Sequence, residues 1–319
     1  MGVPAVGFPA IGFPAPGVLL LHGGAAHPEE LGGALTSWHW EPAVLLGIAA
    51  AGLGYGLLAW RLWRASGRFD GRAAAAWALG LLAVLAALQS PLDAVAGERL
   101  LSAHMLQHGL LMSVAPPLLL LGLYPRLVVP FTRPLVRPLL RNRRTHALLR
   151  AASMPALAIG AWLAVLYAWH VPALYEAALR NETVHVVEHL FFVNVGLLFW
   201  MPVIQPVPAL VRVSPPAKLA YLAAGQLGTA FLAAILIWGP PLYPFYDAAR
   251  ELWGLSAAAD QRIGGLTMMV VDMLVALSAA GWVVSGALAT ADRRGRRERA
   301  SGSNPSPAAE REAGSWRAT

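Results

Sequence analysis

Two pairs of histidines stand in apolar stretches of this sequence, each pair with a spacing of four residues. The stretch SAHMLQHGLLM carries His104 and His108, and the stretch HVVEHLFF carries His185 and His189. On a helix, residues four apart lie on the same face, so each pair presents two imidazoles side by side. An ionisable side chain inside a membrane helix is costly unless it has a partner or a function. The two pairs therefore indicate a metal or cofactor site.

A third stretch adds ligands of other types. Asp260, Gly264, Met268 and Asp272 follow one another at intervals of four and so form one stripe of a helix. Met268 offers a thioether, and Gly264 with Gly265 lets a neighbouring helix approach closely. We therefore place Met268 with the four histidines as a predicted metal ligand.

Five further residues are weaker candidates, either as ligands or as groups that orient the ligands. Met112 continues the stripe of the first histidine pair, and Glu188 lies on the face of the second. Asp260 begins the stripe of the third stretch. His170 in YAWHVPALY and Asp93 in QSPLD stand where apolar stretches end, and both also suit interfacial polar positions.

These ligand types leave several chemistries open. The sequence has no cysteine, which excludes thiolate metal sites, iron–sulfur clusters and a thiol nucleophile. Imidazole and thioether together suit copper, above all Cu(I), while the histidines alone are compatible with zinc. Histidines on different helices also serve as the axial ligands of a haem. In addition, HVVEH matches the H-x-x-E-H spacing of a metalloprotease class, in which Glu188 would be the general base.

The composition predicts that these residues lie in a membrane protein. Of the 319 residues, 57% are hydrophobic and 13% are charged, which is too few charges to cover the surface of a soluble domain of this size. Seven apolar stretches are long enough to cross about 30 Å of hydrocarbon. They lie near residues 43–60, 73–89, 100–123, 154–171, 184–204, 217–238 and 263–290. We expect an all-α polytopic membrane protein, a bundle of seven transmembrane helices.

The basic residues give the expected orientation. Segments 61–72, 124–150, 205–218 and 291–319 hold 4, 7, 2 and 7 of the 24 Lys and Arg residues, and the other four lie in the alternate loops. Because cytoplasmic loops retain positive charge during insertion, the N-terminus is predicted outside and the C-terminus in the cytoplasm, in the cell inner (plasma) membrane. Both histidine pairs then lie near the outer ends of their helices. The net charge of +7 is explained by this topology and does not indicate nucleic acid as a partner.

The chain divides into three predicted regions. Residues 1–37, rich in Pro and Gly, are expected to form an extracytoplasmic tether, and residues 38–290 the seven-helix transmembrane domain. The polar and basic residues 291–319 are expected to form a disordered cytoplasmic tail. Residues 124–150 mix Arg with Leu, Val and Pro, which suits either a segment lying on anionic membrane lipid or a plain basic loop.

Several separated motifs point to one family. They are WHWEP (38–42), SPLD (90–93), SAHMLQHGLLMSVAPPLLLLG (102–122), WHVPALYEAAL (169–179), HVVEHLFFVNVGLLFW (185–200) and DQRIGG (260–265) followed by Met268. With these motifs the chain resembles the polytopic CtaG family of cytochrome c oxidase assembly factors, which is distinct from the single-span copper chaperone of the same name. The resemblance covers residues from about 38 to 290 and leaves out both ends of the chain.

The resemblance implies a seven-helix membrane protein that helps to mature the copper-containing oxidase. It implies a copper-binding neighbourhood made by His104, His108, His185 and His189, with Met268 beside them. The expected partners are subunits of cytochrome c oxidase, and the expected activity is copper handling without catalytic turnover. A haem-binding membrane redox protein and an intramembrane metalloprotease remain the alternative interpretations.

Overall fold

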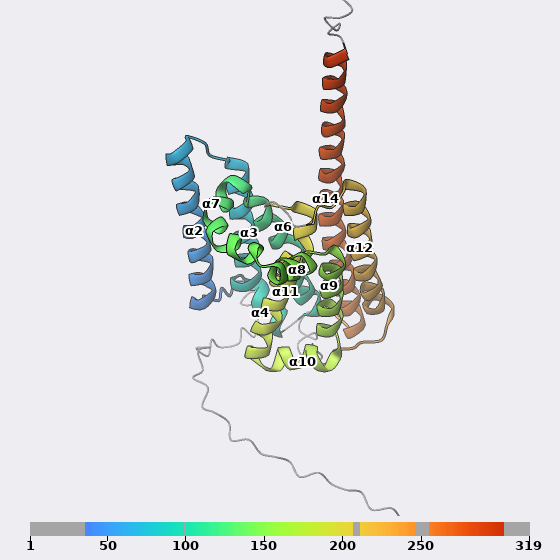
Figure 1. Ribbon diagram of the computed structural model, residues 1–319. Coiled ribbons are helices and arrows are strands. Elements are labelled where there is room, and N and C mark those ends of the chain that lie inside the picture. The colour runs from blue at the N-terminus through green and yellow to red at the C-terminus, as the bar shows by residue number, and fades with distance from the viewer. Residues whose placement is uncertain (1–35, 99, 207–210, 247–254, 303–319) are drawn as a thin grey trace, which may run out of the picture.

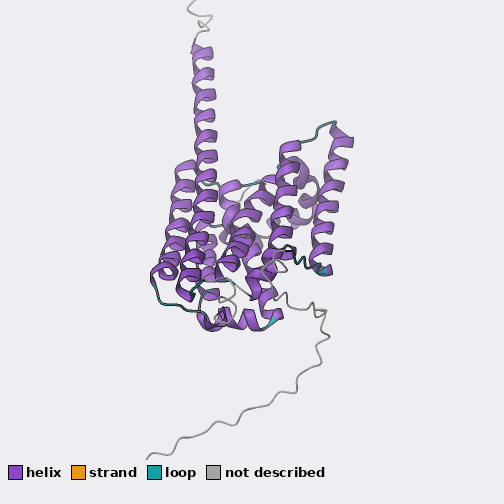
Figure 2. Ribbon diagram, turned by 180° about the vertical axis from the view of Figure 1, so that it is seen from behind, coloured by secondary structure: helices purple, strands orange, loops and turns teal. Residues whose placement is uncertain are grey.

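The structure is a computed structural model that describes residues 36–98, 100–206, 211–246 and 255–302. Every regular element within these residues is helical (Figures 1 and 2). The longer elements are α2 (Pro42–Ser66), α3 (Gly71–Gln89), α11 (Glu182–Ile204), α12 (Pro215–Trp238) and α14 (Ala257–Gly302). One continuous span consists of α5 (Leu101–Gly109), the π-helical turn η1 (Leu110–Val114) and α6 (Ala115–Gly122). The shorter elements are α4 (Pro91–Glu98), α7 (Pro125–Arg141), α8 (Arg143–Ala152), α9 (Pro155–Trp169), α10 (Pro172–Arg180) and η2 (Pro244–Tyr246).

The spans confirm an all-α polytopic membrane protein. Among the described residues, six helices are long and apolar enough to cross a membrane, and the pair α9 and α10 makes a seventh when counted together. That pair is bent by 71°. The bend follows from Pro172, because a proline disfavours helical backbone at the residue before it, and Val171 is extended. The expected span 154–171 is therefore a short helix that ends at Trp169 and turns sharply aside.

Short-range signals fix where the helices begin. A proline at the first or second helical position opens α2, α7, α9, α10 and α12, where its missing N–H is no loss. Side-chain caps mark the start of other helices. Asp70 accepts hydrogen bonds from the first turn of α3, and Asn181 accepts one from Val184 at the start of α11.

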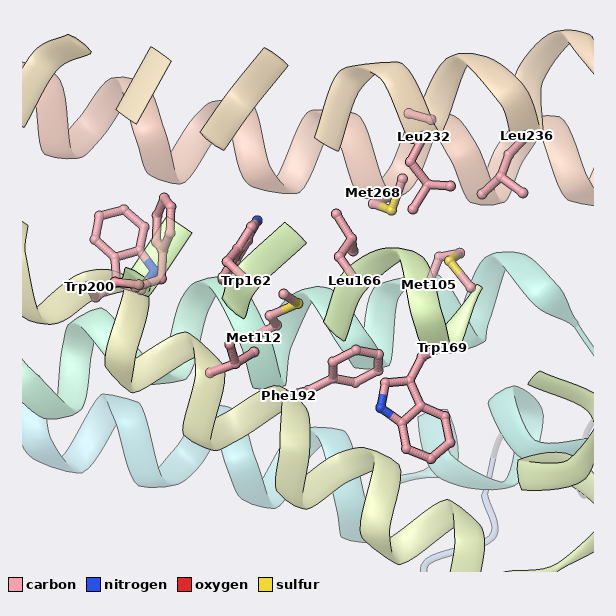
Figure 3. Packing of buried hydrophobic residues seen from close by; sticks show 14 of the residues in the cluster. Met105, Met112, Trp162, Leu166, Trp169, Phe192, Trp200, Leu232, Leu236 and Met268 are labelled. Carbon is pink, nitrogen blue, oxygen red and sulfur yellow. The ribbon is translucent and has the colours of Figure 1, made fainter. Parts of the chain in front are cut away.

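The helices that carry the histidines pack in the interior of the bundle. Helix α14 packs along α12 and against α5, and α11 packs against α9 and α6. Two glycines allow these contacts: a Cβ on Gly265 would lie 3.0 Å from the Ala233 carbonyl oxygen, and one on Gly196 would lie 2.5 Å from that of Met112. Large buried side chains, among them Trp162, fill the space between the helices (Figure 3).

The C-terminal helix is longer than predicted. Residues 291–302, expected to be disordered, continue α14 as helix, and this exposed part projects from the bundle at the end opposite α10 (Figure 1). Arg, Glu and Ala are good helix formers, and Arg296 pairs with Asp292 one turn earlier. Residues 303–319 and the predicted tether up to residue 35 lie outside the described residues. The basic stretch 124–150 is not a plain loop, because it forms α7 and most of α8.

Candidate metal centre

Two helices bring the predicted histidine pairs together. His104 and His108 come from α5, and His185 and His189 come from α11. The ring centroids of His104 and His185 lie 5.5 Å apart, and those of His108 and His189 lie 5.8 Å apart. The Nε2 atoms of His104 and His108 are 2.7 Å apart. We call these four residues, together with Glu188, the His/Glu cluster.

Glu188 lies inside this cluster and is fully buried. One carboxylate oxygen is 3.9 Å from His104 Nε2 and the other is 3.7 Å from His108 Nε2. Neither oxygen has a hydrogen-bond partner among the described residues. One ligand atom each from His104, His185 and Glu188 lie within 4.8 Å of one another, the spacing of groups that share a metal ion. The sequence named Glu188 only as a weaker candidate, yet the structure brings it to the middle of the ligands.

Other ring nitrogens of the cluster are also buried without a hydrogen-bond partner in the described part of the chain. They are His108 Nδ1, His185 Nε2 and His189 Nε2. Buried polar atoms in native proteins nearly always have a hydrogen-bond partner, so several unpaired ones in one place need an explanation. A bound cation would satisfy them together, because imidazole nitrogens and a carboxylate are its usual ligands.

The ring of His104 is oriented by groups outside the cluster. Its Nδ1 atom lies 3.2 Å from the carbonyl oxygen of Ala96 in α4 and 3.1 Å from the hydroxyl of Tyr246. A carbonyl oxygen can only accept, so Nδ1 carries the proton and Nε2 presents its lone pair to the cluster. This is the arrangement by which proteins fix the tautomer of a metal-binding histidine.

Tyrosines that the sequence analysis did not single out cover the cluster. The hydroxyl of Tyr175 in α10 lies 3.2 Å from that of Tyr246, and the Tyr175 ring packs 5.1 Å from His104. Tyr243 stacks on Tyr175 and donates a hydrogen bond to the His170 carbonyl oxygen. Burial holds the pKa of Tyr246 well above its usual range, so its hydroxyl stays protonated. Because Tyr243 and Tyr246 come from a connection without helical periodicity, no pattern in the sequence indicated them.

Asp260 positions the helix that carries the first histidine pair. Its two carboxylate oxygens accept hydrogen bonds from the backbone N–H groups of Leu101, at 2.8 Å, and Ser102, at 3.1 Å. These groups open α5 and would otherwise lack an intrahelical partner. Asp260 is therefore an N-terminal cap supplied by α14, and its oxygens face α5 instead of the His/Glu cluster.

Asp93 supports the same helix from α4. One of its oxygens accepts a hydrogen bond of 2.6 Å from Gln107, the residue before His108, and the other lies 3.5 Å from His39. Gln107 also donates to the Ala87 carbonyl oxygen and so ties α5 to α3. Asp93 thus holds the surroundings of the cluster in place.

Met268, Met112 and His170 are not among the groups that surround Glu188. The structure brings these three together around a neighbouring cavity of about 20 Å³, which His108 also lines. His170 Nε2 lies 3.4 Å from the sulfur of Met105, a methionine that the sequence analysis did not single out. Soft ligands therefore lie next to the His/Glu cluster, and His108 is common to both sites.

The turn that follows His108 departs from regular helix. Residues Leu110–Val114 form a π-helical turn, in which the Ala115 N–H reaches back to the Leu110 carbonyl oxygen. Pro116 and Pro117 explain it, since neither has an N–H for the preceding turn and a wider turn relieves the clash of their rings. Such turns are frequent at functional sites. Here the turn sets the direction of Met112 relative to His108.

Comparison with known proteins agrees with the resemblance read from the motifs. A family model described as cytochrome c oxidase caa3 assembly factor (Caa3_CtaG) matches residues 53–289. Two uncharacterized proteins, one of Mycobacterium bovis and one of Mycobacterium tuberculosis, are each 26% identical over 273 residues. The match covers 80% of this chain, which spans about 40% of the length of these curated relatives. No solved structure matches. Because the family model covers most of the sequence, including both histidine pairs and Met268, the chain belongs to the family of cytochrome c oxidase caa3 assembly factors.

Proposed function

We propose that this chain binds copper in the His/Glu cluster and passes it to a subunit of cytochrome c oxidase during assembly of the oxidase. Membership of the caa3 assembly-factor family supports the oxidase as partner. The distribution of Lys and Arg supports a site at the outer side of the cell inner membrane. The copper is cargo, so the proposal needs binding and release but no catalytic turnover.

The observation that carries this proposal is the burial of the Glu188 carboxyl group among imidazoles. A carboxylate without partners inside a membrane bundle is strongly disfavoured, and the cost of an uncompensated buried ion is several kcal/mol. Both oxygens of Glu188 lack a hydrogen bond from any residue that the structure describes, while imidazole nitrogens lie beside them. A bound metal ion neutralises the carboxylate and uses the same nitrogen lone pairs, so a single occupant satisfies the whole group.

Copper is the metal that the surroundings of the cluster favour. Zinc is compatible with the imidazoles and the carboxylate, but thioethers select Cu(I). Met105, Met112 and Met268 line the cavity next to His108, and the chain contains no thiolate that would trap the ion. Release by ligand exchange to another histidine or methionine site is then feasible.

A haem fits the cluster poorly. Two axial histidines must face each other across the whole macrocycle. Here the rings of His104 and His108 contact each other at a centroid distance of 4.1 Å, and Phe192 packs 4.3 Å from His108. Glu188 occupies the space between the two helices. We therefore favour a single ion over a haem.

The metalloprotease interpretation needs Glu188 to act on a water beside a bound peptide. The carboxylate is instead fully buried among the ligands, and Tyr175 and Tyr246 cover the cluster. This geometry supports Glu188 as a group that holds the metal.

A deletion strain tests the proposed function. Deleting the gene should leave the oxidase polypeptides synthesised but poor in copper and inactive, with partial rescue by added copper. The measurements are oxidase activity and oxidase-bound copper in membranes. Normal oxidase activity in the deletion strain would contradict the proposal.

Complementation with variants sharpens this test. His185→Ala should fail to restore the oxidase, and His146→Ala on α8, outside the cluster, should restore it. Glu188→Gln keeps a carbonyl oxygen that can coordinate and should restore activity in part. An inactive Glu188→Gln variant that retains its full metal content would favour the metalloprotease instead.

A further inference from the structure

A small cavity shares His108 with the His/Glu cluster and is bordered by α5 and α14. Its lining includes Met105, Met112 and Met268, together with His108, His170 and Asp272. We call it the methionine cavity. Its volume of about 20 Å³ has room for one water molecule or one metal ion.

The three thioethers come from different parts of the chain. Met105 belongs to α5, Met112 to the π-helical turn and Met268 to α14, and all three are buried in the packed interior (Figure 3). A buried methionine by itself is usually a core residue. Three that line one cavity of this size, beside two histidines, make a set of ligands that prefers Cu(I).

His170 presents a ligand atom to this set. Its Nδ1 donates a hydrogen bond of 2.7 Å to the Leu166 carbonyl oxygen, so in the neutral ring Nε2 carries a lone pair. That lone pair lies 3.4 Å from the sulfur of Met105. For a tetrahedral ion with metal–nitrogen and metal–sulfur distances of about 2.0 and 2.3 Å, two ligand atoms lie about 3.5 Å apart. The nitrogen and the sulfur are thus already spaced as two ligands of one ion.

His108 connects the methionine cavity to the His/Glu cluster. Its Nε2 faces His104 and Glu188, while its Nδ1 is buried and has no hydrogen-bond partner within the described ranges. The ring itself lines the methionine cavity. His108 therefore borders both groups of ligands, and an ion that moves between them past this ring stays inside the bundle.

Asp272 adds a carboxyl group at the same cavity. It lies on α14 one turn after Met268, lines the cavity, and accepts a hydrogen bond from the Ser113 hydroxyl. A carboxylate in the membrane interior marks an ion pathway more often than a packing position. When ionised, this carboxyl would compensate the charge of a monovalent cation held by neutral thioethers and imidazoles.

From these contacts we infer that the methionine cavity is a second Cu(I) site, loaded from the His/Glu cluster through His108. The inference rests on the proposed copper function and adds that copper occupies two sites one after the other. The His/Glu cluster takes copper first, and the sulfur ligands then hold it in the reduced state that thioethers prefer.

The test counts the copper ions and identifies their neighbours. The full chain, purified in detergent without oxygen, is titrated with Cu(I) against a coloured Cu(I) chelator. We expect two Cu(I) per chain, and X-ray absorption at the copper edge should show sulfur neighbours near 2.3 Å. The combined Met105→Leu, Met112→Leu and Met268→Leu variant should bind one Cu(I) and lose the sulfur signal, because leucine keeps the volume but not the ligand.

A matched control replaces three exposed methionines instead, by the changes Met154→Leu, Met201→Leu and Met273→Leu. It should bind two Cu(I) and keep the sulfur signal. One copper per chain in the wild type, or two in the cavity variant, would overturn the second site and leave the proposed function intact. No copper bound by the wild type would overturn both. If the cavity variant does not fold, the wild type alone still tests the second site: sulfur neighbours of copper support it, and their absence contradicts it.

Discussion

Helix α2 and the span Leu101–Gly122 are both apolar and long enough to cross a membrane, yet they occupy opposite environments. In the most apolar stretch of each, 6% of the α2 residues are buried within the protein, against 67% for Leu101–Gly122. The first lies at the edge of the bundle (Figure 1). It exposes large side chains such as Leu46, Leu53 and Trp60. The second carries His104 and His108 between α11 and α14.

The two spans differ in role: α2 anchors the protein in the membrane, and Leu101–Gly122 carries the candidate ligands. In lipid, an apolar side chain gains nothing by turning inward, so apolarity alone does not tell a peripheral helix from a central one. Polar side chains do distinguish a central helix from a peripheral one, since such side chains must face the interior of the bundle. The difference predicts that equal changes on the two spans have unequal effects, both on stability and on metal binding.

The largest effect on stability is expected at Gly196. A Cβ there would lie 2.5 Å from the Met112 carbonyl oxygen, so Gly196→Val must push α11 away from the π-helical turn. Overpacking of this kind costs about 1–3 kcal/mol or more. Gly54→Val makes the same change on α2, where nothing lies within 4 Å of the added Cβ. The thermal midpoint in detergent should fall clearly for the first variant and little for the second, and equal midpoints would contradict the comparison.

A smaller effect is expected from the two aspartate caps. Asp260→Ala removes the cap of α5, and Asp70→Ala removes the cap of α3, beside α2. Each should cost about 1 kcal/mol of stability. Only Asp260→Ala should also weaken copper binding, by about tenfold, because it loosens the helix that holds His104 and His108. If both variants bind copper as the wild type does, Asp260 has only a structural role.

Much of the fold was predictable from the sequence, because apolar length and the Pro, Asp and Gly signals act locally. The bend between α9 and α10 was not predicted, although Pro172 causes it, since an apolar stretch that turns aside looks like one that continues. The disordered tail was placed too early, because residues 291–302 are polar but good helix formers. The close approach expected at Gly265 is confirmed by its contact with α12.

Only those features of the site that depend on the spacing of residues along one helix could be predicted from the sequence. That spacing placed His104, His108, His185 and His189 in pairs, and the structure brings the pairs together. It did not indicate that Met268 and Met112 gather at a neighbouring cavity, that Asp260 faces the start of α5, or that Tyr246 contacts His104. These positions depend on which helices are neighbours and on how one loop folds back, and no local pattern contains that information.

The central claim is that the His/Glu cluster binds copper, and copper binding by the purified chain tests it most directly. Wild type, His185→Ala and His146→Ala are loaded with copper, passed over a chelating resin and analysed for copper per chain. We predict that the wild type and His146→Ala retain copper equally. His185→Ala removes a ligand and should weaken binding at the cluster more than about 100-fold. Equal copper retention by all three proteins would contradict the account.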